Sequence, residues 1–328
     1  MPVVSVITPF HRVTPYLRPM VASVLAQTMG DLELLLVDNG TGTGLSTLGE
    51  LAGDPRIRLL SSPANEGASL ARNRAVAEAR GDYIAVLDYD DLARPARLEQ
   101  QVACLRADPQ LGLVSSQVES IDGTGQGVGR EFALQPGRAQ YDFSGYSMPA
   151  PISSYTGRRG VFARYPFRAI FDFAEDYDFL SRAAEAWPLG AVPGVLLEYR
   201  VHDGQTTRLG NCTQVLLASY VRLLTARRRA GRPEALPELM GELRRGRLEP
   251  PPLAATYADF ARRCLAEHFP LLAVYHARKL LSVRRDRSAL GTALGVLAGA
   301  LRQEPRAAVT LTRMFFTGPL RTHGLRPG

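Results

Sequence analysis

The chain has 328 residues, of which 45% are hydrophobic, enough for one large domain and a smaller one and too apolar for a disordered chain. Its three cysteines form no CxxC pair and are odd in number, which argues against a disulfide framework or a structural zinc site. The net charge of +7 is uneven: residues 1–204 carry −6 and residues 205–328 carry +13, and so basic a second part suggests an anionic partner.

The first two thirds of the chain alternate short β-branched runs with amphipathic stretches, the pattern of a sheet covered by helices. Several of the runs are almost continuously apolar, so both faces of the sheet should be buried. The expected strands are Val3–Thr8, Glu33–Asp38, Ile57–Ser61, Tyr83–Leu87 and Leu113–Ser116. The expected crossover helices are Tyr16–Gln27, Leu45–Ala52, Ala68–Ala79 and Ala96–Ala107.

Glycine, proline and isolated aromatic residues dominate residues 122–151, where we expect a long irregular segment of the kind that often serves binding sites. After Tyr199 the pattern changes to one helix after another, broken by prolines. We therefore place a domain boundary near residue 205, with an α/β domain at residues 1–205 and a basic helical region at residues 206–328.

Four consecutive residues, Asp88-Tyr89-Asp90-Asp91, directly follow the expected strand Tyr83–Leu87. This edge of a parallel sheet is where ligands bind. In an extended chain Asp88 and Asp90 point to one side, so they could share Mg²⁺ or Mn²⁺ and leave positions for diphosphate oxygens. The alternative is a solvated acidic turn in which Asp91 caps the next helix.

Two further segments are expected near this edge. Asp38 ends the second strand and should lie beside Asp88. Arg72 lies on the helix that begins after residues 65–67, where free backbone donors and a guanidinium favour an anion. The alternative for Arg72 is an ordinary solvated side chain.

Farther along the chain, Glu175 and Asp176 begin a helical stretch, although acidic residues are also expected in a first turn because of the helix dipole. Residues 199–202 close a strand-like run that starts at Val192. His202 is a candidate ligand for metal or phosphate, whereas a lone histidine is more often structural or solvated.

Taken together and in this order, these segments resemble glycosyltransferase family 2. The resemblance implies a GT-A, Rossmann-like α/β fold, with a mixed, mainly parallel sheet flanked by helices and followed here by a C-terminal helical region. It also divides residues 1–205 into a donor half of about 1–118 and an acceptor half of about 119–205. The segments that carry it are Val4–His11, Ser23–Thr28, Glu33–Gly40, Asn65–Asn73, Gly81–Asp91, Glu175-Asp176 and Tyr199–His202.

The resemblance implies an inverting, metal-dependent, hexosyltransferase-like glycosyltransferase. It would move a sugar from a UDP-, GDP- or dTDP-sugar to an acceptor hydroxyl in polysaccharide, cell-envelope or other glycoconjugate synthesis. The implied cofactor is Mn²⁺ or Mg²⁺, and the implied catalytic base is Asp176. The implied metal ligands are Asp90, Asp88 and His202, and the implied nucleotide-sugar contacts are Thr8, Pro9, Asp38, Asn65, Arg72, Asp88 and Tyr89.

Two other functions stay open at this level, namely a catalytically silent nucleotide-sugar-binding module and a transferase that acts on a peptide or a small molecule. Intact Asp88, Asp90 and Asp176 argue against the silent module. The chain departs from the family pattern at two positions. It has Asn39 where the family often has a second aspartate, and His11 where the family often has asparagine, and both positions bear on which donor is bound.

The arginine clusters of the basic region lie in separate expected helices without interleaved aromatic residues, so we expect no nucleic-acid partner. Solvated helix faces or contact with an anionic membrane would account for them. No targeting segment is evident, and the weakly polar run Ala289–Leu301 is too short to cross a bilayer. We therefore expect a cytoplasmic protein, peripheral at the inner face of the membrane if it docks there, and a homodimer stays open.

Overall fold

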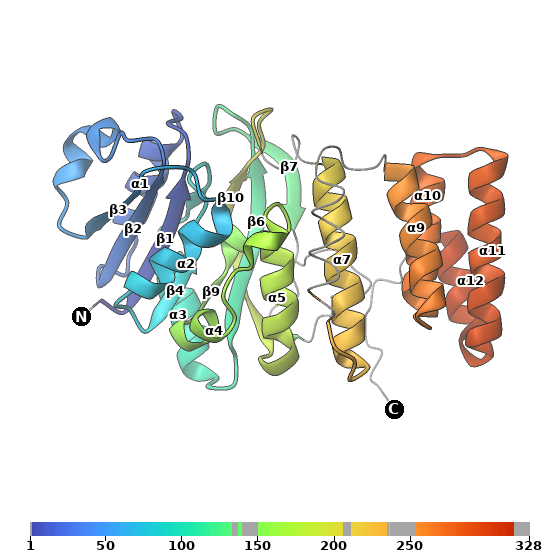
Figure 1. Cartoon of the computed structure of the whole chain (residues 1–328). Coiled ribbons are helices and arrows are strands. Elements are labelled where there is room, and N and C mark those ends of the chain that lie inside the picture. Colours follow the sequence, from blue (N-terminus) through green and yellow to red (C-terminus); the bar gives the residue numbers. More distant parts are fainter. Residues whose placement is uncertain are drawn as a thin grey trace. The chain divides into compact units, whose positions relative to one another are not determined.

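The computed structural model describes residues 2–132, 137–139, 150–205, 211–234, 236 and 253–317. Two compact units make up these residues, one reaching to residue 205 and the other starting at residue 211. Figure 1 colours the chain from its N-terminus in blue to its C-terminus in red.

The first unit is built on one sheet. Its strands are β1 Val4–Phe10, β2 Leu32–Asn39, β3 Ile57–Ser62, β4 Tyr83–Val86, β5 Leu92–Ala93, β6 Leu113–Ile121, β7 Gly127–Phe132, β8 Gly137–Ala139, β9 Thr156–Arg158 and β10 Leu189–Arg200. Across the described residues they follow the order β3-β2-β1-β4-β9-β6-β10-β5, with β7 beside β6 and β8 beside β10. Strands β3, β2, β1 and β4 are parallel, whereas β9 is antiparallel to β4 and β6. The carboxyl ends of β2, β1 and β4 therefore meet at one edge.

Helices cover both faces of this sheet. They are α1 Leu17–Leu25, η1 Ser46–Gly53, α2 Ala68–Glu78, α3 Arg97–Ala107, η2 Ile152–Ser154, α4 Arg159–Arg164, η3 Ala169–Phe171 and α5 Glu175–Ala186. Because side chains alternate along a strand, one face presents Val6, Leu34 and Ala85 to α1, η1 and α3. The opposite face, with Ile7 and Leu35, is covered by α2 and α4. Figure 1 shows α2 crossing in front of the strands.

The expected strands and helices all occur, with differences at their ends. Residues 46–53 form a 3₁₀ rather than an α-helix, interrupted where Gly49 adopts φ 60°. The segment 122–151, expected to be irregular, contains β7 and β8, and its residues 133–136 and 140–149 lie outside the described residues. Strands β5 and β9 were not expected, because two or three residues are too few for a periodic pattern.

The second unit is helical. Helix α10 packs against α9, α11 and α12, and this bundle buries Phe260, Val274 and Val296. Within the described residues no helix combines the length and the apolar character that crossing a membrane requires. The helices are α7 Asn211–Arg229, α9 Leu253–Ala266, α10 Pro270–Val283, α11 Arg287–Gln303, η4 Pro305–Ala307 and α12 Ala308–Thr317.

Candidate active site

The acidic segment after β4 forms an anchored turn. The backbone N–H of Asp91 donates to the carbonyl oxygen of Asp88 at 3.2 Å, so these residues do not continue the strand as an extended chain. Asp91 is 1% exposed and accepts a hydrogen bond of 2.9 Å from the backbone N–H of Arg200. It therefore fastens the turn to β10 and does not cap α3, which begins at Arg97. The alternative of a solvated acidic turn is wrong for Asp91.

Asp90 and His202 form the central contact of this turn. The Oδ2 atom of Asp90 lies 3.0 Å from Nε2 of His202, and both side chains are largely buried. Burial, followed by the charge of Asp88, raises the pKa of Asp90, although His202 opposes the shift. The ring of Tyr16 lies 5.0 Å from that of His202 and carries the guanidinium of Arg200 at 4.6 Å. The imidazole is therefore held between Asp90 and an aromatic neighbour.

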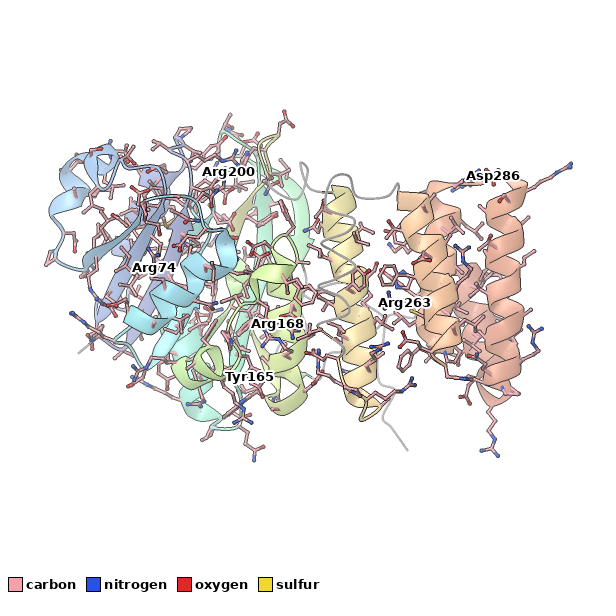
Figure 2. All side chains as sticks on the ribbon, in the orientation of Figure 1. Arg74, Tyr165, Arg168, Arg200, Arg263 and Asp286 are labelled. Carbon is pink, nitrogen blue, oxygen red and sulfur yellow. The ribbon has the colours of Figure 1, made fainter. Side chains whose placement is uncertain are left out.

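Arg200 connects this contact to the sheet. Its Nε donates to the carbonyl oxygen of Asp90 at 2.8 Å, and its Nη1 donates to that of Asp122 at 2.9 Å. Figure 2 labels Arg200 at the upper end of the sheet. The sequence alone did not assign a role to Arg200 or Tyr16. Arg200 could have been suspected because it lies two residues before His202, whereas nothing in the sequence pointed to Tyr16.

Arg72 joins the turn to the first turn of α5. Its Nη2 donates to Oδ1 of Asp88 at 2.8 Å and its Nη1 donates to Oε1 of Glu175 at 2.5 Å, while its guanidinium lies over the ring of Phe167 at 5.5 Å. Burial alone would lower the pKa of Arg72, but the charges of Asp88 and Glu175 raise it. Arg72 is therefore a buried, doubly paired cation and not a solvated side chain.

Asp176 follows Glu175 in α5 and is partly buried. Burial, followed by the charge of Glu175, raises the pKa of Asp176 to about 7, and Asp88 adds to the shift. A carboxyl group with a pKa near neutrality can exchange a proton at ordinary pH, which is what general acid–base chemistry requires.

Asp38 lies at the expected edge, but its carboxylate accepts hydrogen bonds from the loop that directly follows it. Oδ1 accepts from the backbone N–H and the hydroxyl of Thr41 at 2.8 and 2.6 Å, and Oδ2 accepts from the backbone N–H of Gly44 at 2.9 Å. Burial raises the pKa of Asp38, but these hydrogen bonds outweigh it and the pKa is lowered. Asp38 therefore stays ionised and shapes the loop that follows β2.

Asn39 orders the loop before α2, a role that sequence reasoning missed. Its Nδ2 donates to Oδ1 of Asn65 at 2.9 Å, and its Oδ1 accepts from the backbone N–H of Glu66 at 3.0 Å. The Oδ1 atom of Asn65 also accepts from the backbone N–H of Gly67 at 3.0 Å. The predicted contact residue Asn65 is therefore held next to the end of β2.

The remaining expected contacts differ in accessibility. The side chain of Thr8 is fully buried, with its hydroxyl 4.0 Å from Sδ of Met20, so it faces α1 rather than the turn. Pro9 is partly buried near the end of β1.

The hydroxyl of Tyr89 accepts a hydrogen bond of 2.8 Å from Nε of Arg12. Arg12 also donates to the carbonyl oxygen of Gly204, so it links the turn to the segment that follows β10.

The chemistry of Asp90 and His202 suits a divalent cation. In this structure the two side chains are hydrogen-bonded to each other, and a carboxylate oxygen and an imidazole nitrogen are both ligands that divalent metals accept. In the part of the chain that the structure describes, no group of three or more His, Cys, Asp or Glu residues is arranged to hold a metal ion. Asp88 instead accepts a hydrogen bond from Arg72 through its Oδ1 atom. Such a two-residue site would need donor phosphates and water to complete it, as is common for Mg²⁺.

The chain is similar to known glycosyltransferases. Residues 5–165 match the family model described as glycosyl transferase family 2. An uncharacterized glycosyltransferase of Haemophilus influenzae is 28% identical over 225 residues, which cover 65% of this chain and 70% of that protein. The succinoglycan biosynthesis protein ExoO of Rhizobium meliloti is 38% identical over 106 residues, which cover 31% of this chain and 30% of that protein.

Among solved structures, S. aureus TarS residues 1–349 in complex with UDP-GlcNAc gives a TM-score of 0.57. The match covers 95% of this chain and 84% of that one, at 14% sequence identity. The likeness confirms the expected mixed α/β GT-A fold.

Proposed function

Because the chain belongs to glycosyltransferase family 2, we propose that it is an inverting, metal-dependent glycosyltransferase that uses a nucleotide diphosphate sugar and an acceptor hydroxyl. The observation that supports this most is the ion-pair bridge through Arg72. It connects Asp88, in the turn that also holds Asp90 and His202, to Glu175, the residue before Asp176. This bridge supports the proposal that donor-binding and proton-accepting groups meet at one edge of the sheet.

In the proposed reaction Asp176 accepts the proton of the acceptor hydroxyl while that oxygen attacks the anomeric carbon. Attack from the face opposite the nucleotide inverts the configuration at that carbon. With a pKa near 7, Asp176 is ionised in a large fraction of molecules at neutral pH and yet basic enough to take a proton. Glu175 is committed to Arg72 and Asp178 to Arg168 and Arg182, which leaves Asp176 as the acceptor of the proton in this first turn.

We propose that Asp90 and His202 hold Mn²⁺ or Mg²⁺ together with the donor diphosphate, and that Asp88 contacts the donor ribose or the metal. When bound, the cation supplies Lewis-acid stabilisation of the negative charge that develops on the leaving diphosphate. The loops ordered by Asp38 and Asn39 would receive the nucleoside, with Arg72 fixing the position of Asp88.

The relatives suggest where the reaction belongs. One relative is named for succinoglycan biosynthesis, and the structural neighbour was solved with UDP-GlcNAc. We therefore propose a role in polysaccharide or cell-envelope synthesis in the cytoplasm, and a UDP-sugar is the first donor to test. The match covers only 30% of the length of the succinoglycan protein. A role like that of the succinoglycan protein is therefore part of this proposal.

The test is a screen of UDP-, GDP- and dTDP-sugars with Mn²⁺, read as release of the nucleoside diphosphate. We expect one donor class to be hydrolysed slowly without acceptor, and Asp90→Ala to abolish the release. Glu50→Gln, a change of an exposed carboxylate on η1, is the control and should leave it intact. Tight nucleotide binding without turnover of any donor, with or without acceptor sugars, would instead identify a silent binding module.

A further inference from the structure

The outer side of α11 is apolar, which is unusual for a helix at a protein surface. A surface helix ordinarily turns its apolar stripe inward and presents polar residues to water. Helix α11 buries Val296 and Leu297 on its inner side, yet Leu290 and Leu294 are 46% and 45% exposed. Residues 288–301 contain no charged side chain. The helix therefore has apolar groups on both sides, and its outer side lacks a partner in the described structure.

The exposed residues of α11 follow one line along the helix. Arg287, Leu290, Leu294, Ala298 and Arg302 are all exposed and are spaced by three or four positions, so they share one side. We call this line the outer face of α11. It is an apolar stretch with an arginine at each end.

Helix α12, which packs against α11, also presents apolar groups outward. Val309 is 81% exposed and Phe316 is 68% exposed, and Arg313 lies between them at helical spacing. Leu311 and Phe315 of the same helix are buried. With Leu290 and Leu294 on the neighbouring helix, these residues make several large apolar side chains exposed on one pair of helices, which is more than scattered single residues.

The charge around this apolar face distinguishes between the two partners that could cover it, a second copy of the chain and a lipid surface. A second copy of the chain would bring two positively charged surfaces together, which is unfavourable. An anionic lipid surface has the opposite sign and attracts arginines next to apolar groups. The exposed charges at the ends of α11 and along α12 are Arg284, Arg285, Arg287, Arg302, Arg306 and Arg313 against Asp286 and Glu304.

We propose that the outer face of α11, together with Val309 and Phe316, docks on an anionic lipid bilayer. Helix α11 lies in the plane of the membrane surface, with its leucines among the upper acyl chains and Arg287 and Arg302 on lipid phosphates. Figure 2 labels Asp286, whose Oδ1 accepts from the backbone N–H of Ala289 and so caps this helix at its exposed beginning. The proposal concerns the helical unit alone and does not depend on the proposed activity.

Co-sedimentation of the full chain with vesicles tests the proposal. We expect binding to phosphatidylglycerol-containing vesicles, weak binding to pure phosphatidylcholine vesicles, and a loss of binding at high salt. Leu290→Glu with Leu294→Glu should weaken binding about tenfold or more, because the apolar contact is lost and like charges are added. Leu271→Glu, at a leucine of α10 that is 47% exposed and outside this face, is the matched control and should bind as the wild type does.

A second measurement covers the case in which the double variant folds poorly. Leu294→Trp should show a blue-shifted emission with anionic vesicles, quenched by brominated lipid. Absence of wild-type binding at low salt, or an unchanged affinity of the double variant, would overturn the proposal. The proposal would also be overturned if the wild type formed a dimer in solution, did not bind vesicles, and became a monomer in the double variant Leu290→Glu with Leu294→Glu. The partner of this face would then be a second copy of the chain. Donor hydrolysis without vesicles should be equal in all these variants, which separates this test from that of the proposed function.

Discussion

The guanidinium of Arg72 donates to the carboxylate of Glu175 across 2.5 Å, although the two residues are 103 positions apart. Arg72 comes from α2 and Glu175 begins α5, so the contact joins the beginning of α5, through Arg72, to Asp88 in the turn after β4. Both side chains are largely buried. A buried charge without its partner is strongly unfavourable, so each member of this bridge depends on the others.

We expect Arg72→Ala to lower the free energy of unfolding of the first unit by about 3 kcal/mol, because it leaves Glu175 buried and unpaired. Arg74→Ala, on the same helix, removes a pair with Glu66 in which both side chains are about one third exposed, and should cost less than about 1 kcal/mol. Figure 2 labels Arg74. Urea unfolding followed by the fluorescence of Trp187 measures both. Equal losses would show that the buried bridge contributes no more than a surface pair.

The sequence predicted the elements of the first unit better than it predicted the contacts between them. Strands such as Glu33–Asp38 are apolar runs bounded by turn residues, and their positions follow from local pattern. The bridge from Arg72 to Glu175 depends on how α2 and α5 pack, and no local pattern encodes it. Glu175 accordingly looked like an ordinary acid of a first helical turn, and Asp176 was expected to be the residue of interest.

Other features of the site followed from position alone. Asp88 and Asp90 were expected at the carboxyl end of a parallel strand, and that is where β4 places them. Their extended geometry was wrong, because the hydrogen bond from Asp91 to Asp88 closes a turn. The burial of Thr8 against Met20 could not be predicted, because it depends on the packing of α1 on β1.

The second prediction concerns Asp176 as the base. Asp176→Asn should lower turnover about 100-fold or more while leaving the affinity for the donor within about twofold, because the proton acceptor is lost and the shape is kept. In the wild type, turnover should fall about tenfold per pH unit below an apparent pKa near 7, the pKa to which burial raises this group. Initial rates and calorimetric donor binding measure these effects. A variant with normal turnover would remove Asp176 from the mechanism.

The same pKa shift predicts an opposite effect on stability. Between the ordinary pKa of 3.8 and about 7 the folded chain keeps Asp176 protonated whereas the unfolded chain ionises it, so this group makes stability fall as pH rises through that window. Asp176→Asn carries no charge to bury, and it should therefore unfold at a higher temperature than the wild type at pH 8 and at nearly the same temperature at pH 4. Thermal unfolding at the two pH values measures the difference. A variant that is less stable than the wild type at pH 8 contradicts the shift.

The next prediction concerns the metal ligands. His202→Gln should weaken Mn²⁺ binding in the presence of UDP about tenfold or more, because one of the two proposed protein ligands is lost. Electron paramagnetic resonance of free Mn²⁺ measures this without turnover. His268→Gln changes an exposed histidine in the second unit and should leave Mn²⁺ binding intact. If both variants bind Mn²⁺ as the wild type does, His202 is a structural partner of Asp90.

The last prediction concerns Gly67, which immediately precedes α2 and adopts φ 88° and ψ 164°. A Cβ atom at this position would lie 2.0 Å from Oδ2 of Asp172, whereas Gly42, at φ 68°, has no atom within 4 Å of its Cβ position. Gly42→Ala therefore measures the strain of a positive φ without a collision, which should destabilise by about 1 kcal/mol. Gly67→Ala should destabilise by about 2 kcal/mol or more, because the strain and the collision add.

Asp172 also accepts a hydrogen bond from the backbone N–H of Ser69, so moving it should disturb the start of α2 and with it Arg72. The double change Gly67→Ala with Asp172→Ala removes the collision. Because only the backbone strain and the lost hydrogen bond then remain, the double variant should be more stable than Gly67→Ala alone, and its donor affinity should recover in part. Urea unfolding of the four proteins separates the terms, and equal losses for Gly42→Ala and Gly67→Ala would show that Asp172 moves aside freely.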